Sequence, residues 1–173
     1  VHLHVHSQYS ILDGQAAIKK LVDKAIADEM KGIAITDHGN MMGIKEFYNY
    51  VNKINKDKEG DKKLKPIIGC EVYIADRRMF NKEVKEDRGY HLILLAKNQK
   101  GYHNLVKIVS KAWSEGYYYN PRTDKVELEK YHEGLICCSA CLGGEIPKKK
   151  KNGKLDKAEE AVMWYKNLFG DDY

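Results

Sequence analysis

The chain opens with Val1-His2-Leu3-His4-Val5-His6, and Ser10-Ile11-Leu12-Asp13-Gly14 follows shortly after. Alternating valine and leucine predict a β-strand over about Val1–Val5, and Asp13-Gly14 predicts a turn. Side chains on a strand alternate between its two faces, so the histidines share one face. Imidazoles there replace apolar burial, which indicates a bound metal because histidine is a common metal ligand.

Length and composition indicate one folded domain. The 173 residues are enough to bury a core, and 43% hydrophobic with 32% charged residues is typical of a globular protein. No apolar run approaches the ~20 residues that span a membrane, and no signal peptide is apparent. We therefore expect a cytoplasmic protein that does not contact membranes.

The cysteines cluster at Cys137, Cys138 and Cys141, with Cys70 alone. This spacing is unlike a secreted disulfide framework and favours a reducing compartment. Cys138 to Cys141 matches C-x-x-C, but the chain has no second such motif and no helix start after it, so a redox pair is the weaker interpretation.

The net charge of +5 comes largely from two basic stretches, Lys53–Lys65 and Lys148–Lys154. Either stretch could contact a phosphate backbone, but solvated loops are the favoured interpretation. The first is also predicted to be a surface insertion. The charged segment Asp76–Arg88 is predicted to leave the body as a mobile loop.

Strand and helix patterns alternate along the chain, which predicts an α/β fold with a parallel sheet. Helices are expected over residues 16–30, 44–54, 101–115 and 155–169, and further strands over residues 32–36, 66–74, 91–95 and 134–138. Functional side chains in such folds gather beyond the strand carboxyl ends, where His4, His6, Asp37, His38 and Cys141 are expected. His91 stands at the start of its strand, so this rule does not place it.

Five motifs occur in order: H-x-H-S-x-x-S-x-x-D-G (4–14), I-T-D-H-G-N (35–40), G-x-E-V-Y (69–73), Y-H-L-I-L-L-A (90–96) and S-A-C-L-G-G-E-I-P (139–147). Together they resemble the PHP (polymerase and histidinol phosphatase) family. Within that family the chain is most similar to the amino-terminal domain of bacterial replicative DNA polymerases, over nearly its whole length.

The resemblance implies a distorted (β/α)7 barrel, of which residues 1–173 would be the first two-thirds of a single domain. It also implies these metal ligands: His4, His6, Asp13, His38, Glu71, His91 and Cys141. The family's last metal motif, Asp-x-His, and the closing strands are not found in these residues. We therefore expect this fragment to bind fewer metals than the intact domain, which would hold up to three, and to have little activity.

The residue types suit divalent metals. Imidazole, thiolate and carboxylate together favour Zn, while Mn or Fe would favour the histidine and carboxylate positions. Two metals bridged by a carboxylate such as Glu71 can polarise a phosphoryl group, and a metal-bound hydroxide is then the expected nucleophile. No separate catalytic side chain is required.

Several residues have a structural alternative. Asp13 could be only a turn residue, and Asp37 is expected to orient a ligand or cap a helix and not to bind metal. His2 is excluded by the motif register. The remaining structural assignments are core positions for Cys137 and Cys138, a helix start for Glu145, packing or surface roles for His103 and His132, and a protein interface for Tyr117-Tyr118-Tyr119, which could also stack on bases.

Three functions compete. The leading hypothesis is a metal-dependent phosphoesterase that acts as a 3′–5′ exonuclease on the primer 3′ end of DNA, beside the polymerase part of a longer chain. The second is a structural module that binds metal for stability and docks a proofreading subunit. A free-standing small-molecule phosphatase is third, because Gly101–Leu105 and Ser139–Pro147 are of the polymerase type.

Overall fold

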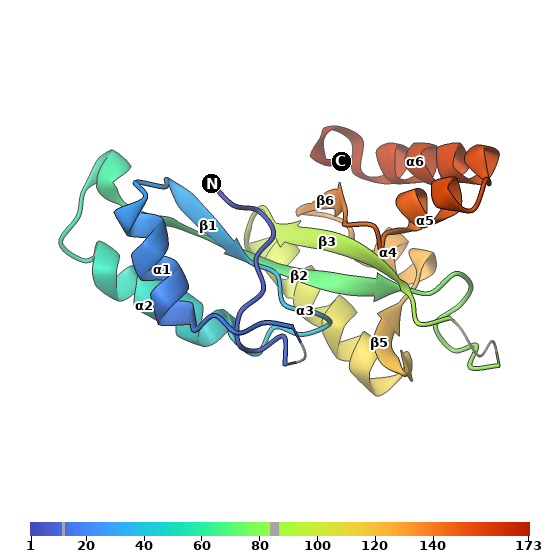
Figure 1. Cartoon of the computed structure of the whole chain (residues 1–173), viewed down its shortest axis with the longest axis horizontal. Coiled ribbons are helices and arrows are strands. Elements are labelled where there is room, and N and C mark those ends of the chain that lie inside the picture. Colours follow the sequence, from blue (N-terminus) through green and yellow to red (C-terminus); the bar gives the residue numbers. More distant parts are fainter. Residues whose placement is uncertain (12, 84–86) are drawn as a thin grey trace.

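The computed structural model describes residues 1–11, 13–83 and 87–173, and its centre is a mixed six-stranded sheet (Figure 1). The strand order is β4-β5-β2-β3-β6, and β1 pairs with β2 beside that path. The strands are β1 (Gly32–Ile35), β2 (Lys65–Ile74), β3 (Tyr90–Ala96), β4 (Tyr117–Tyr118), β5 (Asn120–Thr123) and β6 (Leu135–Ser139). The helices are α1 (Ile18–Ala27), α2 (Ile44–Asn55), α3 (Gln99–Ser114), α4 (Lys125–Tyr131), α5 (Glu145–Lys151) and α6 (Leu155–Phe169), with 3₁₀ turns at Gly60–Lys62 and Gly170–Asp172.

Strand β2 is the longest strand and organises the others. β1 runs parallel to its first half, β5 runs parallel to its end, and β3 runs antiparallel to its second half. β6 is antiparallel to β3. The mixed α/β class is confirmed, but the prediction of a parallel sheet is wrong at β3. A strand that returns parallel to its neighbour needs a crossover connection, which is usually a helix. The described residues between β2 and β3 contain no helix.

The amino-terminal segment is extended but is not a strand, so the strand predicted over Val1–Val5 is wrong in detail. His2 makes an isolated parallel bridge to Ile33, and the carbonyl of Val5 accepts from Thr36 N at 2.9 Å. The Val5 amide donates to the Thr36 hydroxyl at 3.0 Å and not to a carbonyl. A side chain thus replaces one bond of the main-chain ladder, and the segment still runs beside β1 (Figure 1).

Two apolar cores flank this sheet. One lies among α1, α2 and β1 and contains the fully buried Ile18, Val22 and Phe47. The other lies between the sheet and helices α3 and α6, with Leu94 and Leu105 at its centre. The helices predicted over residues 44–54, 101–115 and 155–169 are confirmed within a few residues. The first helix is shorter than predicted, because it begins at Ile18 and ends at Ala27.

The described residues of the segment 76–88 form a mostly exposed loop that is anchored to the body at a few points. Met79 is fully buried, and its amide donates to Asp124 Oδ2 at 2.9 Å. The buried Arg122 guanidinium on β5 donates to the carbonyls of Met79, Asn81 and Asp87 at 2.9–3.0 Å. The predicted loop is therefore present, and the buried Arg122 anchors it through three of its carbonyl groups. Its mobility stays a prediction.

The basic stretch 53–65 lies at the surface as predicted, and Asn55 fixes its end through two hydrogen bonds with the backbone of Leu64. Across the described ranges, no helix is both long and apolar enough to cross a bilayer.

Candidate metal centre

Glu71 on β2 is the centre of the site. Strand alternation sends Cys70, Val72 and Ile74 into the core, and it turns Glu71 toward the amino-terminal segment. The Glu71 side chain is 1% exposed. A buried carboxylate is costly unless charged or polar partners compensate for lost hydration. The four histidines around it supply that compensation.

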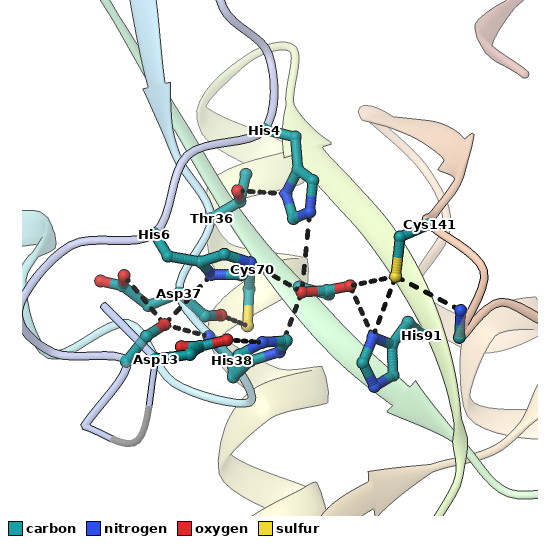
Figure 2. Close-up of polar contacts among 12 residues, drawn as sticks. His4, His6, Asp13, Thr36, Asp37, His38, Cys70, His91 and Cys141 are labelled. Atoms are coloured by element: carbon teal, nitrogen blue, oxygen red, sulfur yellow. Dashed lines mark hydrogen bonds and ion pairs between the residues drawn. The ribbon is translucent and has the colours of Figure 1, made fainter. Parts of the chain in front are cut away.

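The rings of the four histidines converge (Figure 2), and their nitrogens approach both carboxylate oxygens of Glu71. Oε2 lies 2.8 Å from His38 Nδ1, 3.1 Å from His6 Nε2 and 3.7 Å from His4 Nε2. Oε1 lies 2.8 Å from His91 Nδ1. Three triads with mutually close ligand atoms result: His4, His6 and Glu71; His6, Asp13 and His38; His38, Glu71 and His91. The structure thus brings six of the seven residues implied by the resemblance into overlapping triads.

Asp13 reaches this cluster from a tight turn. Its Oδ2 lies 2.7 Å from His38 Nε2, on the side of the ring opposite Glu71. The turn is closed by the amides of Asp13 and Gly14, which both donate to Ser10 O. A Cβ on Gly14 would lie 1.9 Å from Ser7 O, so only glycine fits after Asp13. Asp13 therefore contacts a predicted ligand in addition to serving the turn.

His91 joins the centre because β3 is antiparallel. The start of β3 pairs with the end of β2, and His91 lies opposite Tyr73. Cys141 approaches from the loop after β6, with Sγ 3.5 Å from His91 Nδ1 and 4.0 Å from Glu71 Oε1. Gly143 packs against the His91 ring and donates its amide to Cys141 Sγ at 3.3 Å. Cys141 is thus adjacent to the centre, although it belongs to none of the three triads.

Two hydroxyl groups that the sequence reasoning did not single out hold the histidines. Thr36 Oγ1 lies 2.8 Å from His4 Nδ1, and Ser10 Oγ lies 3.1 Å from His6 Nδ1. Each contact involves Nδ1 and leaves Nε2 facing Glu71. A hydrogen-bond partner on one ring nitrogen fixes the orientation of the ring and so directs the other nitrogen toward a metal. Ser10 stands in the H-x-H-S-x-x-S motif, so the motif itself could have indicated it.

Asp37 acts from behind these groups, as expected. Its buried carboxylate accepts from the amide and hydroxyl of Ser7 at 2.6 and 2.7 Å, and from the Ser10 hydroxyl at 3.3 Å. It contacts no histidine ring in the described structure, so it shapes the loop that carries His6. The alternative that Asp37 caps the next helix is not supported, since α2 has no side-chain cap.

The charges of the site follow from this crowding. Burial by itself raises the pKa of Glu71, but the adjacent imidazoles of His38, His6 and His91 outweigh it and hold the pKa well below its usual range. Proximity to Glu71 raises the pKa of His38 against the effect of burial. Burial lowers the pKa of His4. Glu71 is thus ionised at neutral pH, as a metal ligand must be.

Two buried atoms of the centre test its fit to a cation. His38 Nδ1 and Glu71 Oε2 both lack a hydrogen-bond partner within the described residues, despite their separation of 2.8 Å. Two atoms this close that are not aligned as a hydrogen bond could each donate a lone pair to a shared cation. The donor set of imidazole, carboxylate and nearby thiol fits a divalent metal.

Other residues lie outside the centre. His2 is exposed and belongs to no triad. Cys137 is in the core, as predicted, whereas Cys138 is half-buried and packs against a separate small apolar cluster. Glu145 begins α5, as predicted, and its buried carboxylate is bound by Lys125, Lys149 and Tyr165. All four cysteines are free thiols, so no disulfide supports the redox interpretation.

The fold and the cluster define the class of protein. The PHP domain family model matches residues 2–173, and the chain belongs to this family. Its relatives include the DNA polymerase III subunit alpha of Borreliella burgdorferi, 48% identical over 176 residues, and that of Chlamydia trachomatis, 43% identical over 175 residues. That of Aquifex aeolicus is 43% identical over 179 residues. These alignments cover 99–100% of this chain, which matches the PHP-domain portion of DNA polymerase III subunit alpha and spans only 13–15% of the relatives' length.

Proposed function

We propose that residues 1–173 are the amino-terminal part of a PHP domain in a cytoplasmic DNA polymerase III alpha chain, where the site hydrolyses phosphodiester bonds as a metal-dependent 3′–5′ exonuclease. The observation that carries this proposal is the convergence of four imidazoles on both oxygens of buried Glu71. The relatives' name, DNA polymerase III subunit alpha, supports DNA-directed DNA polymerisation as the proposed parent activity. We propose the primer 3′ end of DNA as the substrate of the exonuclease.

We propose Zn or Mn as the metal, with Fe as a further candidate and up to three ions in the intact domain. His4, His6, Asp13, His38, Glu71, His91 and Cys141 would hold them. Divalent metals in such a site supply Lewis-acid polarisation of a phosphoryl group and lower the pKa of water toward neutrality.

The chain's own residues perform the positioning. Thr36 and Ser10 fix the rings of His4 and His6 through their Nδ1 atoms, so both Nε2 atoms remain directed at Glu71. Glu71 offers one oxygen to each side of the cluster, since Oε2 faces His38 and Oε1 faces His91. This division of its oxygens suits a carboxylate that bridges two cations.

One experiment tests the catalytic proposal. The complete polymerase chain, loaded with Zn or Mn, is given a primer with a mispaired 3′ nucleotide, and released nucleotides are measured. We expect trimming that His6→Ala and Glu71→Gln abolish, while Glu129→Gln, an exposed change on α4, leaves it intact. Polymerisation by the same preparations shows that each variant is folded. Absence of trimming in the metal-loaded wild-type protein would refute the nuclease.

A structural role is the second candidate, and one observation favours it. The cluster joins the amino-terminal segment, β2, β3 and the loop after β6, which lie far apart in sequence. A metal here would hold these elements together, and the domain would then support the polymerase and dock a proofreading subunit. Unfolding on chelation, without nuclease activity in the loaded protein, would favour this role.

A further inference from the structure

An aromatic surface adjoins the metal centre at the end of β2. It consists of Tyr73, Arg88, Tyr118 and Tyr119, and is called the aromatic shelf below. Tyr73 follows Glu71 by two residues on β2, so both side chains point to the same face of the sheet. The Tyr73 ring centroid lies 5.9 Å from that of His38 and 5.3 Å from that of His91. The shelf therefore begins in contact with the proposed ligands.

The other members of the shelf are set beside Tyr73 by strand pairing. Arg122 of β5 lies opposite Tyr73, and its buried guanidinium stacks 4.9 Å from the centroid of the Tyr118 ring. Gly89 packs against Tyr73, since a Cβ built on it would lie 2.8 Å from the tyrosine Cβ. Arg88 comes directly before Gly89, and so lies next to the same point of β2.

Tyr119 forms the outer end of the shelf, between β4 and β5. The residue is 56% exposed, and its ring meets the Tyr118 ring edge-on at 4.7 Å and lies 5.5 Å from the Arg88 guanidinium. Asn120 Nδ2 donates to the Arg88 carbonyl at 2.9 Å and ties the two segments together. Arg88 and Tyr119 are thus paired at the surface, and the neighbouring Tyr118 ring stacks on the buried guanidinium of Arg122.

The backbone of Tyr119 is strained. Its φ of +61° lies in the left-handed region, where asparagine and glycine are at ease and a bulky aromatic residue is unusual. The ring lies mostly in solvent, so core packing does not explain the choice of tyrosine. Strain kept at an exposed aromatic residue is typical of a functional contact.

We propose that the aromatic shelf is a base-stacking subsite for the single-stranded end of a nucleic acid whose terminal phosphodiester lies at the metal centre. The proposal rests on the proposed function. Exposed tyrosine rings offer sequence-tolerant stacking surfaces, and an arginine beside them offers a positive charge to the backbone phosphates. Tyr73 contacts the nucleotide nearest the metal centre, and Tyr119 with Arg88 contacts nucleotides farther along the strand.

The test measures binding without hydrolysis. The chain is treated with EDTA and titrated with a fluorescein-labelled oligothymidylate that carries 2-aminopurine near its 3′ end. We expect quenching of the 2-aminopurine on binding, as stacking requires. Tyr119→Ala should reduce the quenching and raise Kd roughly 5- to 150-fold, the cost of one lost stacking contact. Tyr48→Ala removes an equally exposed tyrosine on α2 and should change neither.

Two further variants separate stacking from folding. Tyr119→Asn should weaken oligonucleotide binding as much as Tyr119→Ala, and it should also raise the thermal midpoint by about 2–4 °C because asparagine relaxes the backbone. Arg88→Gln should lower the slope of log Kd against log salt by about 0.7, as expected for one lost phosphate contact on a single strand.

Unchanged affinity and quenching in Tyr119→Ala would overturn the proposal and mark the shelf as a protein contact. A lower thermal midpoint in Tyr119→Asn would also overturn it, because the tyrosine would then serve the fold. Failure of the shelf leaves metal content and hydrolysis of bis(p-nitrophenyl) phosphate by the metal-loaded complete polymerase chain unchanged. If the proposed nuclease function is wrong, in contrast, that hydrolysis will be absent, whereas the oligonucleotide will still bind in EDTA.

Discussion

His38 Nδ1 lies 2.8 Å from Glu71 Oε2, and these two buried atoms form no hydrogen bond with each other or with any other described residue. The two atoms form a close ion-pair contact that is not aligned as a hydrogen bond. A cation bound between them would accept a lone pair from each atom. A substitution at this pair is therefore the most direct test of metal binding.

Glu71→Gln should remove tight metal binding. The amide keeps the shape of the side chain but loses the charge that all four imidazoles surround. We expect the affinity for Zn and Mn to fall by more than the roughly 10- to 100-fold typical for loss of a partner behind a ligand. Elemental analysis and metal titration check this, with Glu129→Gln as the exposed control. Full metal content in Glu71→Gln would remove Glu71 from the ligand set.

Ser10→Ala tests the support of the histidines. Ser10 Oγ contacts His6 Nδ1, accepts from His38 N at 2.9 Å and donates to Asp37. Its loss should free the His6 ring and weaken metal binding about 10- to 100-fold, without removing a ligand. Competition with a chelator measures this change. Ser114→Ala, an exposed change at the end of α3, should have no effect.

Cys141→Ala should change the preference among metals. Thiolate favours zinc, whereas imidazole and carboxylate serve manganese as well. We expect the affinity for Zn to fall at least about tenfold relative to the affinity for Mn. Titration with each metal gives the ratio, and Cys138→Ala provides the control, since this half-buried neighbour packs against the core. An unchanged ratio would place Cys141 outside the coordination sphere.

Asp124 should make the fold sensitive to acid. Burial raises its pKa, but the Met79 amide, the Arg78 side chain and the Glu127 amide outweigh burial and lower it. The folded state thus binds the proton less readily than the unfolded chain. Its stabilisation is complete above the unfolded pKa of about 3.9 and is lost as the pH falls through the lower folded pKa.

Urea unfolding between pH 6 and pH 2 measures this dependence. Asp124→Asn should be less stable than the wild type at pH 6, and the difference should shrink toward pH 2. Asp156→Asn, an exposed change in the first turn of α6, should follow the wild-type curve. A constant difference between Asp124→Asn and the wild type across this range would contradict the assigned linkage.

Periodicity predicted most of the elements, because the burial pattern of each element is local. The strands around residues 32–36, 66–74, 91–95 and 134–138 are present, as are the four predicted helices. Strand direction was not predictable, since it depends on the connection. After the connection at residues 75–89, β3 runs antiparallel to β2, and this direction places His91 beside the end of β2. The seven-stranded barrel stays a prediction.

The printed sequence by itself indicated the family and predicted the residues of the candidate metal centre, because ordered motifs keep their residue types and spacing in the chain. Only the tertiary structure decided how they meet. Glu71 lies at the centre of the site because side-chain alternation on β2 turns it away from the core. The antiparallel direction of β3 brings His91 to its second oxygen. Thr36 and Ser10 hold the rings through contacts across 32 and 4 positions of sequence. The Ser10 contact lies within one motif, whereas the Thr36 contact depends on packing in space, which no local pattern encodes.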